Sequence, residues 1–315
     1  MAFTVSDLSS DLSYGSIVRD LQPTEIADPG VRKRLYDLWV DRGLIVFRGT
    51  PAEPDVQIAL SEVFGDPEPH PLRDMSREDG FPKLADVYYR PDEGDITRFD
   101  DGSRRGAWLP WHFDLFYLPQ INHGGILRAL TKPEGGGETG FIDRILAYDA
   151  LPDELKQRID GLYGIYVYQP DNTKQRYGSN GGAVLERMHV RSAGVLKRME
   201  LPPVAHPLVF VQPETGRRLL NFSPWYAIGI EGMDQAEADA LLAALVPYAT
   251  DETQAYYHAW QGDEMVLWDN WRMLHCACGV PADKYRHMQR TTITGDYGVG
   301  RFAELSAETR ELLDA

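Results

Sequence analysis

Apolar residues recur along the chain with two different spacings, which predict a mixture of helices and short strands. A helical spacing of about 3.6 residues is found in four segments, residues 31–41, 55–64, 147–161 and 235–248. Short apolar or alternating runs between turn residues predict strands at residues 43–49, 164–169, 204–212, 218–222 and 264–268. Asp234 precedes the last helix and is expected to cap it. Strands with helices packed outside them are compatible with several β-rich folds, and the pattern alone does not select one.

Residues 78–105 lack either spacing and are rich in charged residues, glycine and proline. This composition predicts a long loop, and long ordered loops often cover a binding site as a lid. The chain has no internal repeat, low-complexity stretch or obvious linker. Because β-rich folds of this length are commonly one domain, we expect residues 1–315 to form a single domain.

The segment Trp111-His112-Phe113-Asp114 contains the most informative side chains. In an extended segment alternate side chains point to the same face, so His112 and Asp114 can reach one metal ion. A second histidine would complete the facial triad of two histidines and one carboxylate, which leaves coordination positions open on a non-haem Fe(II). By itself the motif also fits a structural histidine hydrogen-bonded to a carboxylate.

A distant segment offers that second histidine. Residues 264–268 read as an apolar strand, the Asp269-Asn270 pair as a turn, and His275 follows. In the next strand-like stretch Arg286 and Arg290 alternate onto one face, about 13 Å apart at ~3.3 Å per residue, and His287 faces the other way. A guanidinium group binds a carboxylate in bidentate fashion, although two surface arginines are the alternative interpretation.

With these residues in place, the chain resembles the taurine dioxygenase (TauD/TfdA) family of Fe(II)- and 2-oxoglutarate-dependent oxygenases. The resemblance covers most of the chain. It rests on five elements in the family's order and spacing: Trp111-His112-x-Asp114, Gly135-Gly136-Gly137-Glu138-Thr139-Gly140-Phe141, Ala147-Tyr148-Asp149-Ala150-Leu151, Leu267-Trp268-Asp269-Asn270 before His275, and the pair Arg286 and Arg290.

The resemblance implies a fold and a set of ligands. The fold is mainly β with flanking helices, around a double-stranded β-helix (jelly-roll, cupin-like) core. His112, Asp114 and His275 are implied to bind Fe(II), while Arg286 and Thr139 hold the distal carboxylate of 2-oxoglutarate. The implied reaction uses O2 to hydroxylate a C–H bond of a small molecule, with release of succinate and CO2. Desaturation and hydroxylation followed by C–O cleavage are variants that depend on the substrate.

The substrate side is less closely defined by the resemblance. Arg290 and His70 match positions that contact substrate in relatives. Four aromatic residues near the motifs are further candidates, although aromatic clusters are more often core: Trp108, Phe116, Tyr117 and Tyr226. If several of them line the pocket, the substrate is an organic acid with an apolar or aromatic body, its anionic end held by Arg290.

Other functions remain open at this point. The intact Asp114 argues against halogenation, because related halogenases carry Gly or Ala there. A jelly-roll that binds a metal or a small acid without turnover is one alternative, and an oxygenase acting on a protein side chain is another. Zinc-dependent hydrolysis at the same ligands lacks a positioned general base, and a zinc site built from Cys276, Cys278 and His275 lacks further cysteines.

Composition limits the kinds of partner that the protein is expected to bind and the compartment in which it is expected. The net charge of −16 and the pI near 4.9 disfavour nucleic acid and anionic membranes. An apolar run of about 20 residues and a signal-peptide pattern are both missing, so we expect a cytoplasmic protein. A disulfide between Cys276 and Cys278 is geometrically implausible, which fits a reducing compartment. By analogy with the family, a homo-oligomer is possible.

Overall fold

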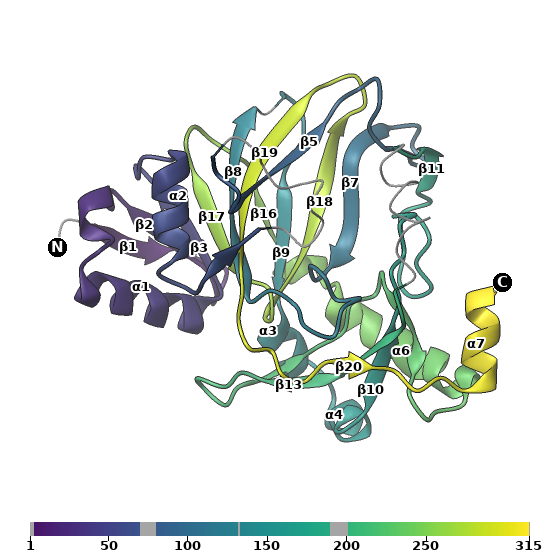
Figure 1. Ribbon diagram of the computed structural model, residues 1–315. Coiled ribbons are helices and arrows are strands. Elements are labelled where there is room, and N and C mark those ends of the chain that lie inside the picture. Colours follow the sequence, from purple (N-terminus) through teal and green to yellow (C-terminus); the bar gives the residue numbers. More distant parts are fainter. Residues whose placement is uncertain (1–2, 70–79, 132, 190–200, 315) are drawn as a thin grey trace.

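The computed structural model describes residues 3–69, 80–131, 133–189 and 201–314. Its largest sheet, which can be followed in Figure 1, has eight strands. In spatial order they are β1 (Thr4–Asp7), β2 (Ser16–Arg19), β3 (Leu44–Arg48), β17 (Met265–Asp269), β8 (Gly124–Thr131), β19 (Arg286–Ile293) and β4 (Pro67–Glu68), with β5 (Leu84–Tyr89) also paired to β19. Within the described chain, the β2–β3 pair is parallel and the other pairs are antiparallel.

A second sheet of six strands faces the first. Its order is β11 (Val184–Arg187), β6 (Ile96–Arg98), β7 (Arg104–His112), β18 (Met273–Pro281), β9 (Thr139–Asp143) and β16 (Tyr256–His258). The chain passes from β7 to β8 to β9, and again from β17 to β18 to β19, changing sheets at each step. This alternation is the topology of a double-stranded β-helix, so the predicted fold class is confirmed.

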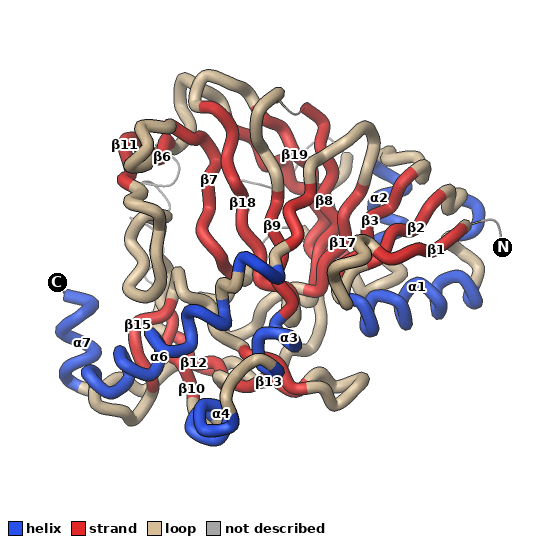
Figure 2. The backbone as a smooth tube through the Cα atoms, turned by 180° about the vertical axis from the view of Figure 1, so that it is seen from behind, coloured by secondary structure: helices blue, strands red, loops and turns tan. Residues whose placement is uncertain are grey.

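Two smaller sheets and most of the helices complete the fold (Figure 2). One sheet contains β15 (Ala227–Ile230), β10 (Tyr163–Tyr166), β12 (Val204–Pro207) and β20 (Arg301–Phe302), and the other pairs β13 (Val209–Val211) with β14 (Arg218–Leu220). The helices are α1 (Pro29–Arg42), α2 (Pro54–Ser61), α3 (Arg144–Asp149), α4 (Asp153–Ile159), α6 (Gln235–Ala249) and α7 (Ala307–Asp314), with short 3-10 turns at Pro23–Glu25 and Glu252–Gln254. Helices α1 and α2 lie beside β1–β3, and the other four gather around the smaller sheets.

Helices α1 and α6 follow from local sequence. Asp28 accepts hydrogen bonds from the first-turn amides of α1, and Asp234 caps α6 in the same way, as predicted. Helix α1 ends where Gly43 adopts a φ of 71°, which glycine tolerates without a Cβ clash. Leu35 and Trp39, four residues apart, are fully buried against the first sheet.

Three sequence predictions were wrong in detail. Residues 78–105 are not one loop, because β5 and β6 lie within them and β5 pairs with β19 through backbone hydrogen bonds. The helix predicted at residues 147–161 is two helices, since Pro152 cannot donate a helical hydrogen bond and disfavours helical geometry at Leu151. The strand predicted at residues 204–212 divides into β12 and β13, which pair with different strands. The lid function of residues 78–105 stays a prediction.

Candidate active site

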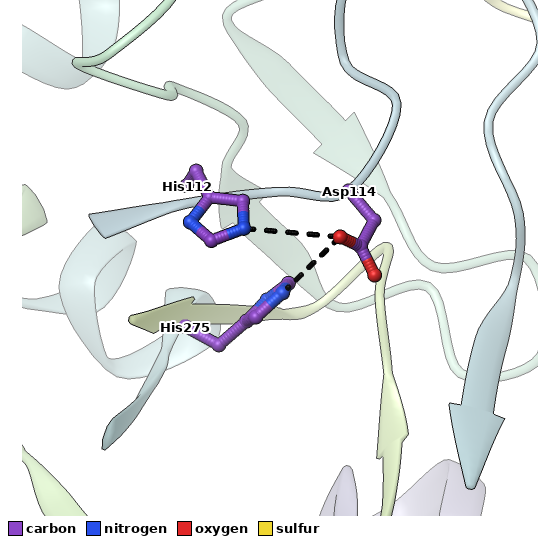
Figure 3. Close-up of side chains that lie close together, drawn as sticks. All are labelled: His112, Asp114 and His275. Atoms are coloured by element: carbon purple, nitrogen blue, oxygen red, sulfur yellow. Dashed lines mark ion pairs between the residues drawn. The ribbon is translucent and has the colours of Figure 1, made fainter. Parts of the chain in front are cut away.

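The three predicted metal ligands meet between the two main sheets (Figure 3). His112 ends β7 and is paired directly with His275 of β18, while Asp114 lies in the turn after β7. Oδ1 of Asp114 is 3.7 Å from Nε2 of His112 and 3.6 Å from Nε2 of His275. Their three donor atoms lie within 4.8 Å of one another. This spacing allows one ion to contact all three.

Backbone carbonyls set the orientation of both imidazole rings. Nδ1 of His112 is 2.7 Å from the carbonyl oxygen of Pro110, and Nδ1 of His275 is 3.4 Å from that of Met273. A carbonyl can only accept, so each Nδ1 carries the proton and each Nε2 presents a lone pair toward Asp114. Metal-binding histidines are commonly held by such contacts, and the donor set therefore fits Fe(II).

Asp114 is kept in its ionised, metal-binding form. Its burial would raise the pKa of the carboxyl group, but the Arg290 guanidinium outweighs burial and holds that pKa well below its usual range. Nη1 of Arg290 is 2.9 Å from Oδ2 of Asp114. The same carboxylate thus offers Oδ1 to the histidine side and Oδ2 to Arg290.

A small cavity of about 90 Å³ adjoins the triad and is lined by both main sheets. Arg286 lines it and is 6% exposed, and no carboxylate within the described part of the chain pairs with it. Burial lowers the pKa of Arg286 to about 10, so the guanidinium remains charged at neutral pH. A buried cation without a protein counter-ion is costly, and an anionic ligand would relieve that cost.

Thr139 lines the same cavity. Its hydroxyl oxygen accepts a hydrogen bond from the indole N–H of Trp260 at 3.2 Å. Because an indole N–H can only donate, the hydroxyl proton of Thr139 is left to donate to another acceptor. Thr139 and Arg286 together therefore form a binding site suited to a carboxylate.

The remaining wall of the cavity is apolar apart from Arg290. The guanidinium of Arg290 lies 5.3 Å from the ring centre of Trp268, and its buried Nε has no hydrogen-bond partner among the described residues. Arg290 can therefore hold Asp114 through Nη1 and still donate to a further acceptor. The other lining residues are Val87, Leu109, Leu127, Phe141, Trp268, Cys276 and Ala277.

The predicted substrate residues are placed in different surroundings. Tyr117 and Tyr226 are close to the centre, with their rings 5.2 Å apart and Tyr226 6.5 Å from the His112 ring. Phe116 is fully buried and stacks on His206 at 4.2 Å. Like Tyr117 and Tyr226, it belongs to the hydrophobic core and is not among the residues that line the cavity, so the substrate contacts of all three stay predictions. His70 lies outside the described residues.

Trp108 also lies away from the small cavity. It lines a separate open cleft of about 820 Å³, together with Cys276 and Cys278. The β7–β18 pairing shifts its register between His112 and Leu109, both of which line the small cavity, and Trp108, next to Leu109, faces the other side of the sheet. The two cysteines are free, and the triad is the one group of potential metal ligands found within the described chain, so the alternative zinc site is not formed.

Sequence reasoning missed several residues around the metal ligands. Val87 and Leu127 come from β5 and β8, and the ring of Trp225 packs edge-on against His112 at 5.3 Å. Val87 stands in the segment predicted as a loop, although Val87-Tyr88-Tyr89 is a run of strong strand formers. That run could have indicated a strand at this position.

The fold and the site define the class of Fe(II)- and 2-oxoglutarate-dependent dioxygenases. The model of the taurine catabolism dioxygenase TauD, TfdA family matches residues 7–292, and the chain belongs to this family. The family resemblance is confirmed. The chain is accordingly an oxidoreductase that requires Fe(II), 2-oxoglutarate (alpha-ketoglutarate) and O2 and acts on small molecules.

Individual relatives cover nearly the whole chain. The (S)-phenoxypropionate/alpha-ketoglutarate-dioxygenase of Sphingobium herbicidovorans is 29% identical over 299 residues, which are 94% of this chain and 96% of that protein. The alpha-ketoglutarate-dependent 2,4-dichlorophenoxyacetate dioxygenase of Burkholderia sp. (strain RASC) is 30% identical over 279 residues, 87% of each chain.

Solved structures share the fold. The crystal structure of a taurine dioxygenase from Burkholderia xenovorans superposes with a TM-score of 0.72 at 25% identity and covers 98% of this chain and 96% of that one. AAD-2 in complex with Mn(II) and N-oxalylglycine superposes with a TM-score of 0.69 at 23% identity and covers 94% and 98%. In the described part of our chain, no helix is long and apolar enough to span a membrane.

Proposed function

We propose that the chain hydroxylates an unactivated C–H bond of a small organic acid that has an apolar or aromatic body. One observation supports this most strongly. A single small cavity brings together the His112, Asp114 and His275 triad, two arginines and a largely apolar wall. Each of these parts matches one of the components that such a reaction requires.

The metal and cosubstrate roles follow from the donor atoms. His112, Asp114 and His275 would hold Fe(II), and the bound metal supplies the activation of O2 that protein side chains cannot provide. Arg286 and Thr139 would bind the distal carboxylate of 2-oxoglutarate. In the net reaction one oxygen atom of O2 enters the substrate as hydroxyl and the other enters succinate, with CO2 released from the oxo acid.

Arg290 would orient the substrate by its anionic group. Its buried Nε remains available for an acceptor while Nη1 holds Asp114. The printed names of the relatives refer to phenoxypropionate, 2,4-dichlorophenoxyacetate, sulfonates and sulfate esters, all of which carry an anionic group. Three enzymes named for aryloxy acids are 29–30% identical to this chain and a fourth is 26% identical, whereas the enzymes named for sulfonates and sulfate esters are 24–26% identical. These identities favour a carboxylate with a ring over an alkylsulfonate.

The first experiment titrates the apoprotein anaerobically with Fe(II) and then with 2-oxoglutarate. We expect the weak visible absorption band of a chelated 2-oxo acid, and we expect His275→Ala to abolish it. A panel of aryloxyalkanoates, alkylsulfonates, alkyl sulfates and neutral aryl ethers then follows, with succinate release as the assay. Faster turnover of the aryloxyalkanoates supports the proposal, while turnover restricted to neutral ethers would refute the role of Arg290.

A substitution separates the two contacts of Arg290. Arg290→Gln removes the charge that favours ionised Asp114 as well as the substrate contact. Metal affinity therefore has to be measured beside the kinetics. A substrate role predicts a rise in KM for acids that is absent for neutral analogues, at metal concentrations that saturate the variant. An equal loss for both kinds of substrate would assign Arg290 to Asp114 alone.

A further inference from the structure

The carboxylate ligand is not held by a strand. Strand β7 ends at His112, and Asp114 follows in a turn where Leu115 adopts a φ of 58°, in the left-handed region that is unusual for a branched side chain. The β-ladder that fixes His112 and His275 therefore does not extend to the third ligand. A metal site of defined geometry needs another anchor at this point.

The side-chain amide of Asn270 provides that anchor. Its Oδ1 accepts a hydrogen bond from the backbone N–H of Asp114 at 2.9 Å, and its Nδ2 donates to the carbonyl oxygen of Asp114 at 3.1 Å. Nδ2 also donates to the carbonyl oxygen of Asn122 at 3.1 Å. One fully buried amide thus takes both backbone polar groups of Asp114, as a neighbouring strand would.

Asn270 is itself held in place close to the proposed metal ligands. It occupies the turn between β17 and β18, and β18 carries His275. Its backbone N–H donates to the carbonyl oxygen of His123 at 2.7 Å. The turn with Asp114 and the strand with His275 are therefore connected through a single side chain.

We infer that Asn270 is a positioning residue that sets the place of the Asp114 carboxylate relative to His112 and His275. The inference rests on the proposed metal site. An amide suits the position because it accepts and donates at once, whereas a carboxylate of the same shape cannot donate and a methyl group can do neither. Without Asn270, the N–H and carbonyl groups of Asp114 lose their partners and the turn becomes free to shift the ligand.

The test compares Asn270→Ala and Asn270→Asp with a matched control. Asn221 is also fully buried, and its Nδ2 donates to the carbonyl oxygen of Pro207 and to the hydroxyl of Tyr297, both at 2.8 Å. It lies outside the cavity lining. Asn221→Ala should therefore lose stability to a similar extent without changing the metal site.

Two readouts are independent of turnover. The first is the affinity for Co(II), used as a spectroscopic substitute for Fe(II), together with the visible Co(II) spectrum. We expect both Asn270 variants to bind Co(II) about 10- to 100-fold more weakly, the range found when groups that orient metal ligands are removed, and to show an altered spectrum. The second is hydrogen exchange of the Asp114 amide in the metal-free protein, which should accelerate in Asn270→Ala and remain slow in Asn221→Ala.

Three results would decide against the inference. Wild-type Co(II) affinity and an unchanged spectrum in both Asn270 variants would overturn it and leave the proposed function standing. A loss no greater than that of Asn221→Ala, at equal loss of stability, would also overturn it. Should His275→Ala bind Co(II) as tightly as the wild type, the metal site itself fails and the inference fails with it. If Asn270→Ala does not fold, Asn270→Asp retains the acceptor and gives the same comparison.

Discussion

Replacing Arg286 by methionine should raise the stability of the metal-free protein and weaken its binding of 2-oxoglutarate. Burial lowers the pKa of Arg286 from its ordinary 12.5 to about 10. One pKa unit corresponds to about 1.4 kcal/mol, so the buried charge costs on the order of 3 kcal/mol in the absence of a ligand. Methionine keeps much of the volume without the charge, and the free energy of unfolding should rise by about 1–3 kcal/mol.

The affinity for the cosubstrate 2-oxoglutarate should fall, whereas the stability rises. Removing one partner of a buried charge pair typically costs about 2–5 kcal/mol, so the dissociation constant of 2-oxoglutarate should rise by a factor of about 30 to several thousand. The assay combines urea unfolding of the apoprotein with the anaerobic titration of the Fe(II) complex. Both are measured on the same preparations.

Arg144→Met is the matched control. Burial also lowers the pKa of Arg144, to about 9, but Nε and Nη1 of this residue donate to the carbonyl oxygens of Leu220 and Ala249 at 2.9 and 2.6 Å. Its removal leaves two buried carbonyls without these donors, at about 1–3 kcal/mol each, and should not affect 2-oxoglutarate. If Arg286→Met instead loses stability as Arg144→Met does and binds 2-oxoglutarate normally, Arg286 is a structural residue and the reasoning is wrong.

Two further predictions concern stability. Arg272 makes a buried bidentate pair with Asp143, and Arg272→Met should lower the unfolding free energy by about 3–5 kcal/mol in urea titrations; a loss below 1 kcal/mol would contradict the pair's importance. Burial lowers the pKa of His123 and of His206 to about 3. Only the unfolded chain binds these protons below pH ~6.5, so stability is full above that pH and falls toward pH 3, by up to about 1.4 kcal/mol per histidine per pH unit. A double Gln variant should show a shallower decline, and an unchanged slope would refute the assignment.

Local sequence determined those features whose causes lie within a few residues. The cap at Asp234 and the buried strand at residues 44–48 were predictable because caps and short buried strands depend on neighbouring residues. The sequence predicted that His112 and Asp114 lie together on one face of an extended segment; they do lie together, but Asp114 is in the turn after β7. The resemblance to the family supplied His275 and the arginines. Donor chemistry is a property of residue type, so the sequence was sufficient to predict a ligand set.

Tertiary structure decided what surrounds those ligands. Phe116 and Tyr117 are adjacent in sequence, yet Phe116 stacks on His206 whereas Tyr117 packs edge-on against Tyr226, whose ring lies 6.5 Å from that of His112. The cavity wall includes Val87 and Leu127, which are brought together because β5 and β8 both pair with β19. Such contacts depend on strand pairing between segments far apart in the chain, and no local pattern encodes that pairing.

Contacts between distant segments also determine the geometry of the site, which the motif alone does not give. The sequence placed Arg290 on the substrate side, whereas the fold also brings its Nη1 to 2.9 Å from Asp114. The two hydrogen bonds between Asn270 and the backbone of Asp114 join positions 156 residues apart. The sequence therefore indicated which residue types are suited to bind a metal and a carboxylate. The packing of the two sheets determined the distances between these side chains, their protonation and their anchoring.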